Sequence, residues 1–322
     1  MRIGLFNKST NIDFVKYHKS FFVFSIVFSI IMVCSVYFRG FNLGIDFKGG
    51  IMLEVKYYNK NPELDIKNDI LQKFKSIGIS HVDIIKLGNS LVYDVTVNMD
   101  AVNKYGDSNV LTENIKNTLK EDYSILRNEF VGPSVSGNII IGAVYSVLFA
   151  LLGIFLYLWF RFDWQYGIMG VLTLIHDCVM GLGFLSIFRF ELDISIIAAI
   201  LTIIGYSIND TVVNFDQVRE NLKRYSDKDK SFILNRSIND VFSRSLSTSI
   251  TVLLVLLSIF FFGGNSLKGF SFTMIIGVVF GTYSSICLAV PMLMYLGNIK
   301  KIKDDKEDDL ELEEDFDVKD NI

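Results

Sequence analysis

The chain has 322 residues, of which 51% are hydrophobic and 14% aromatic, and its formal net charge is −4. This composition is more apolar than that of an average soluble domain. Its three cysteines, Cys34, Cys178 and Cys287, all lie in apolar segments, which argues against a disulfide framework or a cysteine-based metal centre. The sequence therefore favours a membrane protein.

Six apolar runs are each long enough to cross a bilayer as a helix. They cover residues 20–38, 139–160, 166–188, 194–216, 245–263 and 270–296. The first run follows basic residues, as a signal peptide does, but it lacks a small-residue cleavage site, so we expect a retained span. The sequence thus predicts six transmembrane helices, the last five of them within 138–296.

Basic residues are unevenly distributed between the runs. They gather in the N-terminal segment 1–19, between the fourth and fifth runs, and directly after the sixth. Because cytoplasmic loops are rich in Lys and Arg, this distribution predicts that both termini are cytoplasmic. It also places the long polar segment 39–137 on the exported side. Residues 297–322 form an acidic run, which predicts a disordered cytoplasmic tail.

The polar segment 39–137 has the pattern of a small α+β domain. Alternating apolar residues predict strands at 51–58, 81–87, 91–99 and 124–132. Helical periodicity predicts helices at 62–78 and 108–123. The triplet GNS at 88–90 is a hairpin signal. The resulting β-α-β-β-α-β order is ferredoxin-like, and the nearly balanced charge of the segment gives no indication of nucleic-acid binding.

Asp210 is the strongest candidate for a functional residue. It lies about 24 Å along the fourth span from Ile194, if the span is helical, within a hydrocarbon layer about 30 Å thick. A charge there costs at least about 2.5 kcal/mol. Desolvation favours the neutral acid and a nearby cation favours the carboxylate, so such a group can exchange protons. The alternative is that Asp210 only hydrogen-bonds a neighbouring helix.

Other polar residues in the spans are candidates for the same site. Arg244, at the start of the fifth span, would lie at a similar depth to Asp210, although an arginine at a helix end commonly reaches for the interface instead. His176 and Asp177 in the third span could relay protons, or could equally form an interhelical hydrogen bond. Asn209 and Ser207 could orient Asp210 or hold water, or could equally fasten helices together.

Two groups of small residues have a predicted structural role. Gly49 and Gly50 are expected to allow a tight turn or a close backbone approach at the base of the exported domain. Asp46 beside them could tie the first span to that domain. Gly277 and Gly281 form a small-xxx-small face, which predicts helix packing within the chain or against a partner.

Several segments together resemble the SecD/SecF family of protein-export membrane proteins. They are GIDFKGGIMLEV (44–55), VGPSVSG (131–137), GYSINDTVVNFDQVREN (205–221), SRSLSTS (243–249) and GVVFGTYSSI (277–286). SecD-type chains carry a much longer exported region, whereas this one is under 100 residues, so the sequence is similar to the SecF type. The resemblance covers about residues 20–300.

The resemblance implies a subunit that forms a complex with SecD in the bacterial inner membrane. Such a complex uses the proton gradient to assist export, beside the SecYEG channel and its accessory subunits, and contacts exported polypeptides and lipid. It implies that Asp210 corresponds to an acid needed for proton movement, and it favours Arg244 as the partner of Asp210. Ser245 stands where the family usually has Thr.

A purely structural scaffold for SecD and the channel is the alternative function. We do not expect an enzyme, because the chain has no G-x-x-x-x-G-K-[ST] or H-E-x-x-H motif. With only three histidines, we expect no metal centre and no cofactor.

Overall fold

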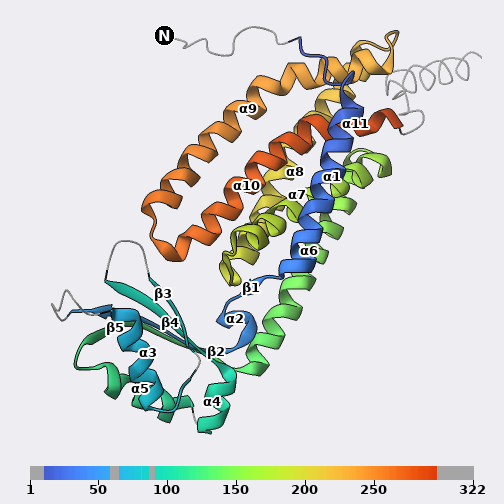
Figure 1. Cartoon of the computed structure of the whole chain (residues 1–322). Coiled ribbons are helices and arrows are strands. Elements are labelled where there is room, and N and C mark those ends of the chain that lie inside the picture. Colours follow the sequence, from blue (N-terminus) through green and yellow to red (C-terminus); the bar gives the residue numbers. More distant parts are fainter. Residues whose placement is uncertain (1–10, 59–64, 81, 87–90, 107, 296–322) are drawn as a thin grey trace, which may run out of the picture.

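The computed structural model describes residues 11–58, 65–80, 82–86, 91–106 and 108–295. The acidic tail at 297–322, the hairpin turn at 88–90 and the first ten residues lie outside the described residues. The described chain forms a helical bundle and a smaller sheet domain at one end of it (Figure 1).

Among the described residues, six helical segments are long and apolar enough to cross a membrane. Five are single helices: α1 (His18–Arg39), α6 (Pro133–Arg161), α7 (Trp164–Phe188), α8 (Ile194–Arg224) and α9 (Lys230–Phe262). The sixth runs from Lys268 to Tyr295. Each predicted run coincides with one of these segments. α8 and α9 also continue past the apolar runs and meet in a short turn, so the polar connection between them is largely helical.

The sixth segment changes its helical form along its length. It consists of α10 (Lys268–Ser284), a π-helical turn η2 (Ser285–Ala289), α11 (Val290–Met292) and a 3₁₀ turn η3 (Leu293–Tyr295). Pro291 has no N–H to donate to a preceding carbonyl, which disturbs the α-helical ladder before it. The sequence did not predict this π turn.

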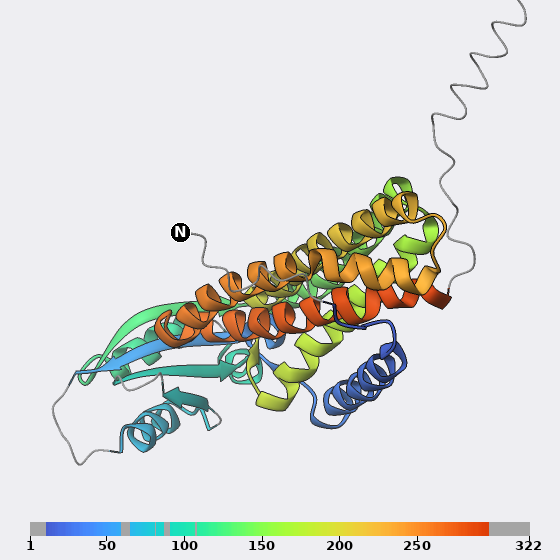
Figure 2. The same cartoon turned by 90° about the horizontal axis from the view of Figure 1, so that it is seen from above.

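α8 is the central helix of the bundle, and it contacts α6, α7, α9 and α10. α1 and α6 both pack against α7. Figure 2 shows the bundle lengthwise, with the sheet domain beyond one end. α6 is exposed along most of its length, although its side chains are mainly apolar. Such a surface suits contact with lipid or with another membrane helix.

The described part of the sheet domain has four strands, β2 (Gly50–Tyr57), β3 (Val82–Lys86), β4 (Val92–Asn98) and β5 (Tyr123–Val131). Their order in the sheet is β3-β4-β2-β5, and all neighbours are antiparallel. Its helices are α3 (Ile66–Ser76), α4 (Met99–Tyr105) and α5 (Ser108–Leu119). Alternate strand residues, such as Leu53 and Val95, are fully buried in a core with residues of all three helices. Each predicted strand and helix is present, whereas α4 was not predicted.

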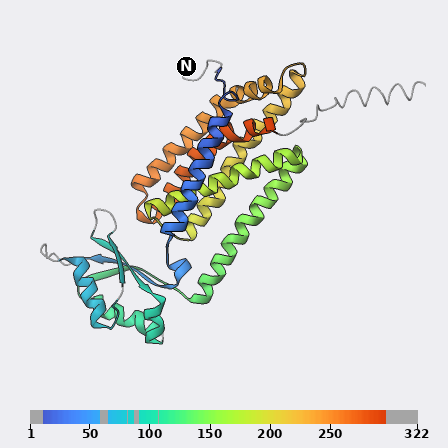
Figure 3. The same cartoon turned by 45° about the vertical axis from the view of Figure 1, so that its right-hand side comes forward.

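A short segment joins the domain to the bundle. It contains β1 (Asn42–Leu43) and α2 (Ile45–Lys48), and β1 pairs in parallel with β6 (Glu191–Leu192), which lies just before α8. Figure 3 shows the two connections between domain and bundle, one after α1 and one before α6. These short elements were also not predicted from the sequence.

Candidate functional site

Asp177, in the middle of α7, is the centre of a buried polar cluster. Its side chain is fully buried. One carboxylate oxygen, Oδ2, accepts hydrogen bonds from Ser207 on α8 at 2.6 Å and from Ser284 on α10 at 2.9 Å. The other, Oδ1, lies 3.0 Å from Nδ1 of His176. The cluster therefore connects three helices through one carboxylate.

The two predicted glycines of α10 make this close packing possible. A Cβ atom on Gly281 would lie 3.2 Å from Ser207 Cβ and 3.5 Å from Asp177 Oδ2. A Cβ atom on Gly277 would lie 2.2 Å from a side-chain carbon of Ile203 on α8. The small-residue face of α10 thus packs against α8 within this chain, and it brings Ser284 within reach of Asp177.

From this cluster, polar contacts between α8 and the last helical segment continue in the direction away from the sheet domain. Thr211 Oγ1 lies 2.9 Å from Ser285 Oγ, and Ser285 Oγ donates to the Ser207 carbonyl at 3.4 Å. Asn214 donates from Nδ2 to the Ser285 carbonyl at the π turn, at 3.3 Å. Sequence reasoning missed Thr211, Asn214 and Ser285. The i, i+4, i+7 spacing of residues 207, 211 and 214 in an apolar run would have identified this stripe.

Asp210 lies beside these polar contacts, and 6% of its surface is exposed. Its Oδ2 atom is buried and has no hydrogen-bond partner among the described residues. Asp210 is 14 residues before the end of α8, and Arg244 is 14 residues after the start of α9. At 1.5 Å per residue both lie about 21 Å from the turn that joins these antiparallel helices. The two predicted partners are therefore at the same depth.

The Arg244 side chain is exposed in this single chain, and its guanidinium exerts a Coulomb attraction on Asp210. Within the described part of the chain, no ion pair at 4.0 Å or less joins the two groups. An attraction without a direct contact leaves room for the two groups to move together or apart.

Polar contacts between α8 and α9 also lie close to Asp210. Ser249 on α9 accepts a hydrogen bond from the Tyr206 hydroxyl at 3.2 Å and contacts the Thr282 hydroxyl of α10. Ser245 lies one turn along α9 from Ser249, on the same face, and its buried hydroxyl has no partner among the residues described. Asp210 is four residues after Tyr206 on α8, and Ser245 is four residues before Ser249 on α9. Because the two helices are antiparallel and Tyr206 contacts Ser249, Ser245 and Asp210 lie at the same level.

Two other predicted site residues have different surroundings. His176 Nε2 is buried without a described partner, and its ring lies 6.3 Å from the rings of Phe280 and Tyr283. Asn209 lies on the exposed surface of α8, outside the cluster. Ser207 is in the cluster, but it donates to Asp177 rather than to Asp210.

The predicted motif at the base of the sheet domain is tightly packed. Gly49 and Gly50 have φ angles of +74° and +139°, and a Cβ atom on Gly50 would lie 2.3 Å from the Val97 carbonyl oxygen. Only glycine fits such a position without strain. Asp46 Oδ2 accepts a hydrogen bond from the backbone N–H of Ile194 at 2.9 Å. Asp46 therefore ties the segment after α1 to the start of α8, rather than to the sheet domain as the sequence suggested.

The described residues contain no group of three or more His, Cys, Asp or Glu side chains that could hold a metal ion. Two carboxylates are at the centre of the site: Asp177, which is fully hydrogen-bonded, and Asp210, which is buried with an unpaired oxygen. Buried hydroxyl groups lie between them, and such groups can both donate and accept hydrogen bonds.

Known proteins are similar to this chain in sequence and in fold. Residues 110–299 match the family described as "Protein export membrane protein SecD/SecF, C-terminal", and residues 35–57 match the SecD/SecF GG motif. The chain is 36% identical over 300 residues to the protein translocase subunit SecF of Rickettsia typhi, covering 90% of this chain and 93% of that protein. It is 34% identical over 299 residues to SecF of Rickettsia bellii, covering 92% and 97%.

Solved structures of SecDF are also similar. The crystal structure of SecDF from Thermus, a translocon-associated membrane protein, matches with a TM-score of 0.78 and 29% identity. SecDF in a super-membrane-facing form matches with a TM-score of 0.64 and 27% identity. Each match covers 90% of this chain but only 39% of the SecDF chain. With a family match over more than half its length and SecF proteins aligned along nearly all of it, the chain belongs to the SecD/SecF family of multi-pass protein-export membrane proteins, as a protein translocase subunit of the SecF type.

Proposed function

We propose that this chain acts in a complex with SecD and uses the proton gradient to assist Sec-dependent export of proteins across the inner membrane. In this proposal both termini are cytoplasmic, and the sheet domain is a ferredoxin-like domain on the periplasmic side. The strand order β3-β4-β2-β5 supports the ferredoxin-like assignment. The basic residues before α1 and around the α8–α9 turn support the orientation.

The observation that carries the proposal is the state of Asp210. It is buried at mid-helix with an unpaired carboxylate oxygen, and Arg244 is at the same depth on the next helix. Arginine stays charged at any physiological pH, so it favours the ionised form of Asp210 when the two are close. When the helices separate them, the low dielectric of the membrane favours the protonated form.

Movement of a proton through this site can supply mechanical work. One elementary charge crossing 100 mV provides about 2.3 kcal/mol, which is enough to change a two-state population about 50-fold. Protonation of Asp210 would weaken its attraction to Arg244 and allow α8 and α9 to repack. Because Asp46 and β1 join the start of α8 to the short segment that leads into the sheet domain, such repacking would tilt the domain and move an exported polypeptide beside the SecYEG channel.

The test is to measure export and assembly separately in the Asp210→Asn variant of the full complex. Asn keeps the size of the side chain but cannot carry a proton as Asp does. We expect export stimulated by the proton gradient to be lost, while co-purification with SecD stays at the wild-type level. Glu220→Gln, on the exposed surface of α8, is the matched control and should leave both readouts unchanged.

A purely structural role is the alternative that the same experiment addresses. A scaffold would need Asp210 only to fasten helices. If Asp210→Asn and Arg244→Lys each reduced assembly and export in parallel, the scaffold would be favoured. Full gradient-stimulated export by Asp210→Asn would refute the proton-coupling proposal.

A further inference from the structure

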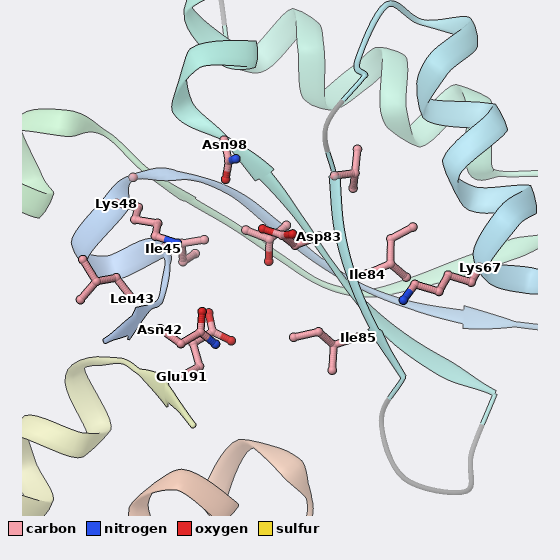
Figure 4. Close-up of a pocket in the computed structure, with 13 residues that line it drawn as sticks. Asn42, Leu43, Ile45, Lys48, Lys67, Asp83, Ile84, Ile85, Asn98 and Glu191 are labelled. Atoms are coloured by element: carbon pink, nitrogen blue, oxygen red, sulfur yellow. The ribbon is translucent and has the colours of Figure 1, made fainter. Parts of the chain in front are cut away.

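Two polar regions of the chain differ in how well their groups balance one another. The cavity of about 330 Å³ between the sheet and β6 is lined by two cations, Lys48 and Lys67, and by two anions, Asp83 and Glu191 (Figure 4). Its charges balance, so it has no excess charge that would select a ligand. The buried polar groups around Asp210, in contrast, cannot satisfy one another.

Three buried oxygen atoms around Asp210 have no hydrogen-bond partner among the described residues. They are Oδ2 of Asp210 and Oδ1 of Asn214 on α8, and Oγ of Ser245 on α9. Ser245 is 1% exposed and Asn214 is fully buried. Buried polar side chains are nearly always bonded to protein or to ordered water. Three exceptions on neighbouring helix faces therefore need a common explanation.

Helix geometry directs Asp210 and Asn214 towards the same groove. Tyr206 points to α9, where its hydroxyl donates to Ser249, and Asn214 points to the π turn, where it donates to the Ser285 carbonyl. Asp210 is one turn from each of them, and four residues rotate an α-helix by only about 40° beyond a full turn. The Asp210 side chain therefore points between these two directions, into the groove between α9 and η2.

Ser245 reaches this groove from the other side. It lies one turn along α9 from Ser249, whose hydroxyl contacts both Tyr206 on α8 and Thr282 on α10, and it is level with Asp210. Side chains one helical turn apart are about 5–6 Å apart at Cβ. Two hydrogen bonds of about 2.8 Å each, made through one small molecule, span the same distance.

The three oxygen atoms lack a donor. Asn214 Oδ1 can only accept, because Nδ2 of the same amide is the donor to the Ser285 carbonyl. An ionised Asp210 also only accepts, and the single hydroxyl hydrogen of Ser245 can serve one acceptor. A water molecule has the two donors that the two acceptors need, and it also accepts a hydrogen bond from Ser245.

The surrounding helices provide no other proton acceptor at this level. Arg244 on α9 stays charged, and His176 and Asp177 on α7 lie one turn nearer the sheet domain, where Asp177 accepts from Ser207. Asp240, one turn nearer the α8–α9 turn, is paired with Arg236. Beyond its first residue, the segment from Lys268 to Tyr295 contains no Asp, Glu, His, Lys or Arg.

We propose that Asp210, Asn214 and Ser245 bind one buried water molecule, through which Asp210 exchanges its proton. The water donates to Asp210 Oδ2 and Asn214 Oδ1 and accepts from Ser245 Oγ. When Asp210 releases a proton to it, the water passes one of its own protons to solvent on the side of the α8–α9 turn and stays neutral. Ser245 is then a positioning residue for this exchange. The exchange rests on the function proposed above, whereas the binding of the water does not.

The melting temperature of Ser245→Ala in the full-length chain tests the binding of the water. Removing a buried hydroxyl that has no partner raises stability, whereas removing one that donates to a bound water lowers it. We expect Ser245→Ala to lower the melting temperature. In the Asn214→Leu background, where the water has lost an acceptor, the same change should raise it.

Ser247→Ala is the matched control, because Ser247 donates to a carbonyl of its own helix. It should change the melting temperature equally in both backgrounds. An unchanged or higher melting temperature of Ser245→Ala alone, or an equal decrease in both backgrounds, would overturn the proposal.

The rate of proton exchange at Asp210 tests the role of the water. After a pH jump, the carboxyl C=O stretching band of Asp210 in the complex with SecD should respond at least about tenfold more slowly in Ser245→Ala, since positioned proton transfer typically contributes about 10²–10⁴-fold to a rate. Ser245→Thr keeps the hydroxyl and should restore the rate, and Ser247→Ala should leave it unchanged. Equal rates in Ser245→Ala and the unmodified complex would overturn the exchange.

The two proposals fail in different ways. If Asp210 has no pH-dependent carboxyl band, the proposed function fails, and the exchange through the water fails with it. The melting temperatures still decide whether the water is bound, because that comparison is made at one pH and does not require Asp210 to titrate.

Discussion

Ser207 on α8 donates a 2.6 Å hydrogen bond to the fully buried carboxylate of Asp177 on α7. Hydrogen bonds between membrane helices contribute about 0.6 kcal/mol on average and up to about 1.7 kcal/mol. This one joins a hydroxyl to a carboxylate in a site closed by Gly281, so we expect it in the upper part of that range.

A double-mutant cycle between Asp177→Asn and Ser207→Ala tests this expectation. We predict a coupling energy of about 1–1.7 kcal/mol, measured from the unfolding free energies of the four proteins in detergent. Ser258→Ala is the control partner for Asp177→Asn, because Ser258 donates only to a carbonyl of its own helix. Additive effects in the Ser207 cycle would show that the hydrogen bond contributes nothing to stability.

The Gly277 position should be intolerant of any side chain. A Cβ atom there would lie 2.2 Å from a side-chain carbon of Ile203, and overpacking of this kind typically costs about 1–3 kcal/mol. Gly277→Ala should therefore lower the thermal stability of the purified chain, and Ile203→Ala should partly restore it. Gly205→Ala is the matched control, since no atom lies within 4 Å of its added Cβ. Equal melting temperatures for the two glycine variants would contradict the observed packing of α10 on α8.

Two carboxylates cap the N-terminus of α8, and each accepts a hydrogen bond from a different backbone N–H. Asp46 accepts from the N–H of Ile194, and Asp193 accepts from the N–H of Ile196, each at 2.9 Å. Loss of such a cap costs about 0.5–2 kcal/mol. We predict that Asp46→Ala speeds hydrogen exchange at Ile194, and that Asp193→Ala speeds it at Ile196. Residue-resolved hydrogen exchange measures this difference. The assignment would be wrong if each variant raised the exchange rates of both amides equally.

The stability of the sheet domain should depend on pH through Asp94. The pKa of Asp94 is about 6 in the folded domain against 3.8 for the free group. The folded state therefore binds this proton more tightly. Its stabilising contribution is fully present below pH 3.8 and is lost as the pH rises through 6. Asp94→Asn should raise the stability of the domain at pH 8 and change it little at pH 4.

Pulse proteolysis of the full chain at the two pH values measures this difference. The change in stability caused by Asp100→Asn, whose side chain is exposed, should be the same at both pH values. A stabilisation by Asp94→Asn that is equal at pH 4 and pH 8 would rule out burial of the Asp94 carboxylate, together with the charges of Glu54 and Glu191, as the cause.

The sequence predicted the elements whose periodicity is strong. The six spans and the strands of the sheet domain follow from long apolar runs and from alternation. The strands lie within a few residues of their observed positions, whereas α8 ends eight residues after its apolar run and α9 begins fifteen residues before its own. The sequence did not predict α4, because seven residues are too few to show helical periodicity. It did not predict β1 and β6 either, because a pairing of two residues between distant segments leaves no local pattern.

The candidate site was predictable residue by residue but not as an arrangement. An acid within an apolar run is conspicuous, so Asp177 and Asp210 could both be identified. Which polar residue contacts which acid depends on the rotation of each helix, and this rotation is set by contacts such as Gly277 against Ile203. For that reason the sequence left open whether Ser207 orients Asp210, its neighbour in sequence, or fastens helices together, and the structure shows that it bonds to Asp177 on the neighbouring helix. Ser285 could not be assigned because the π turn changes the helical phase at that point.

The central claim is that Asp210 binds and releases a proton during the working cycle. Infrared difference spectroscopy of the complex with SecD in liposomes tests it most directly, because a protonated carboxyl group has its own C=O stretching band. We predict a band that appears as the pH is lowered between 9 and 5, is absent in Asp210→Asn, and shifts its midpoint in Arg244→Gln. A spectrum in which Asp210→Asn removes no pH-dependent carboxyl band would contradict the account.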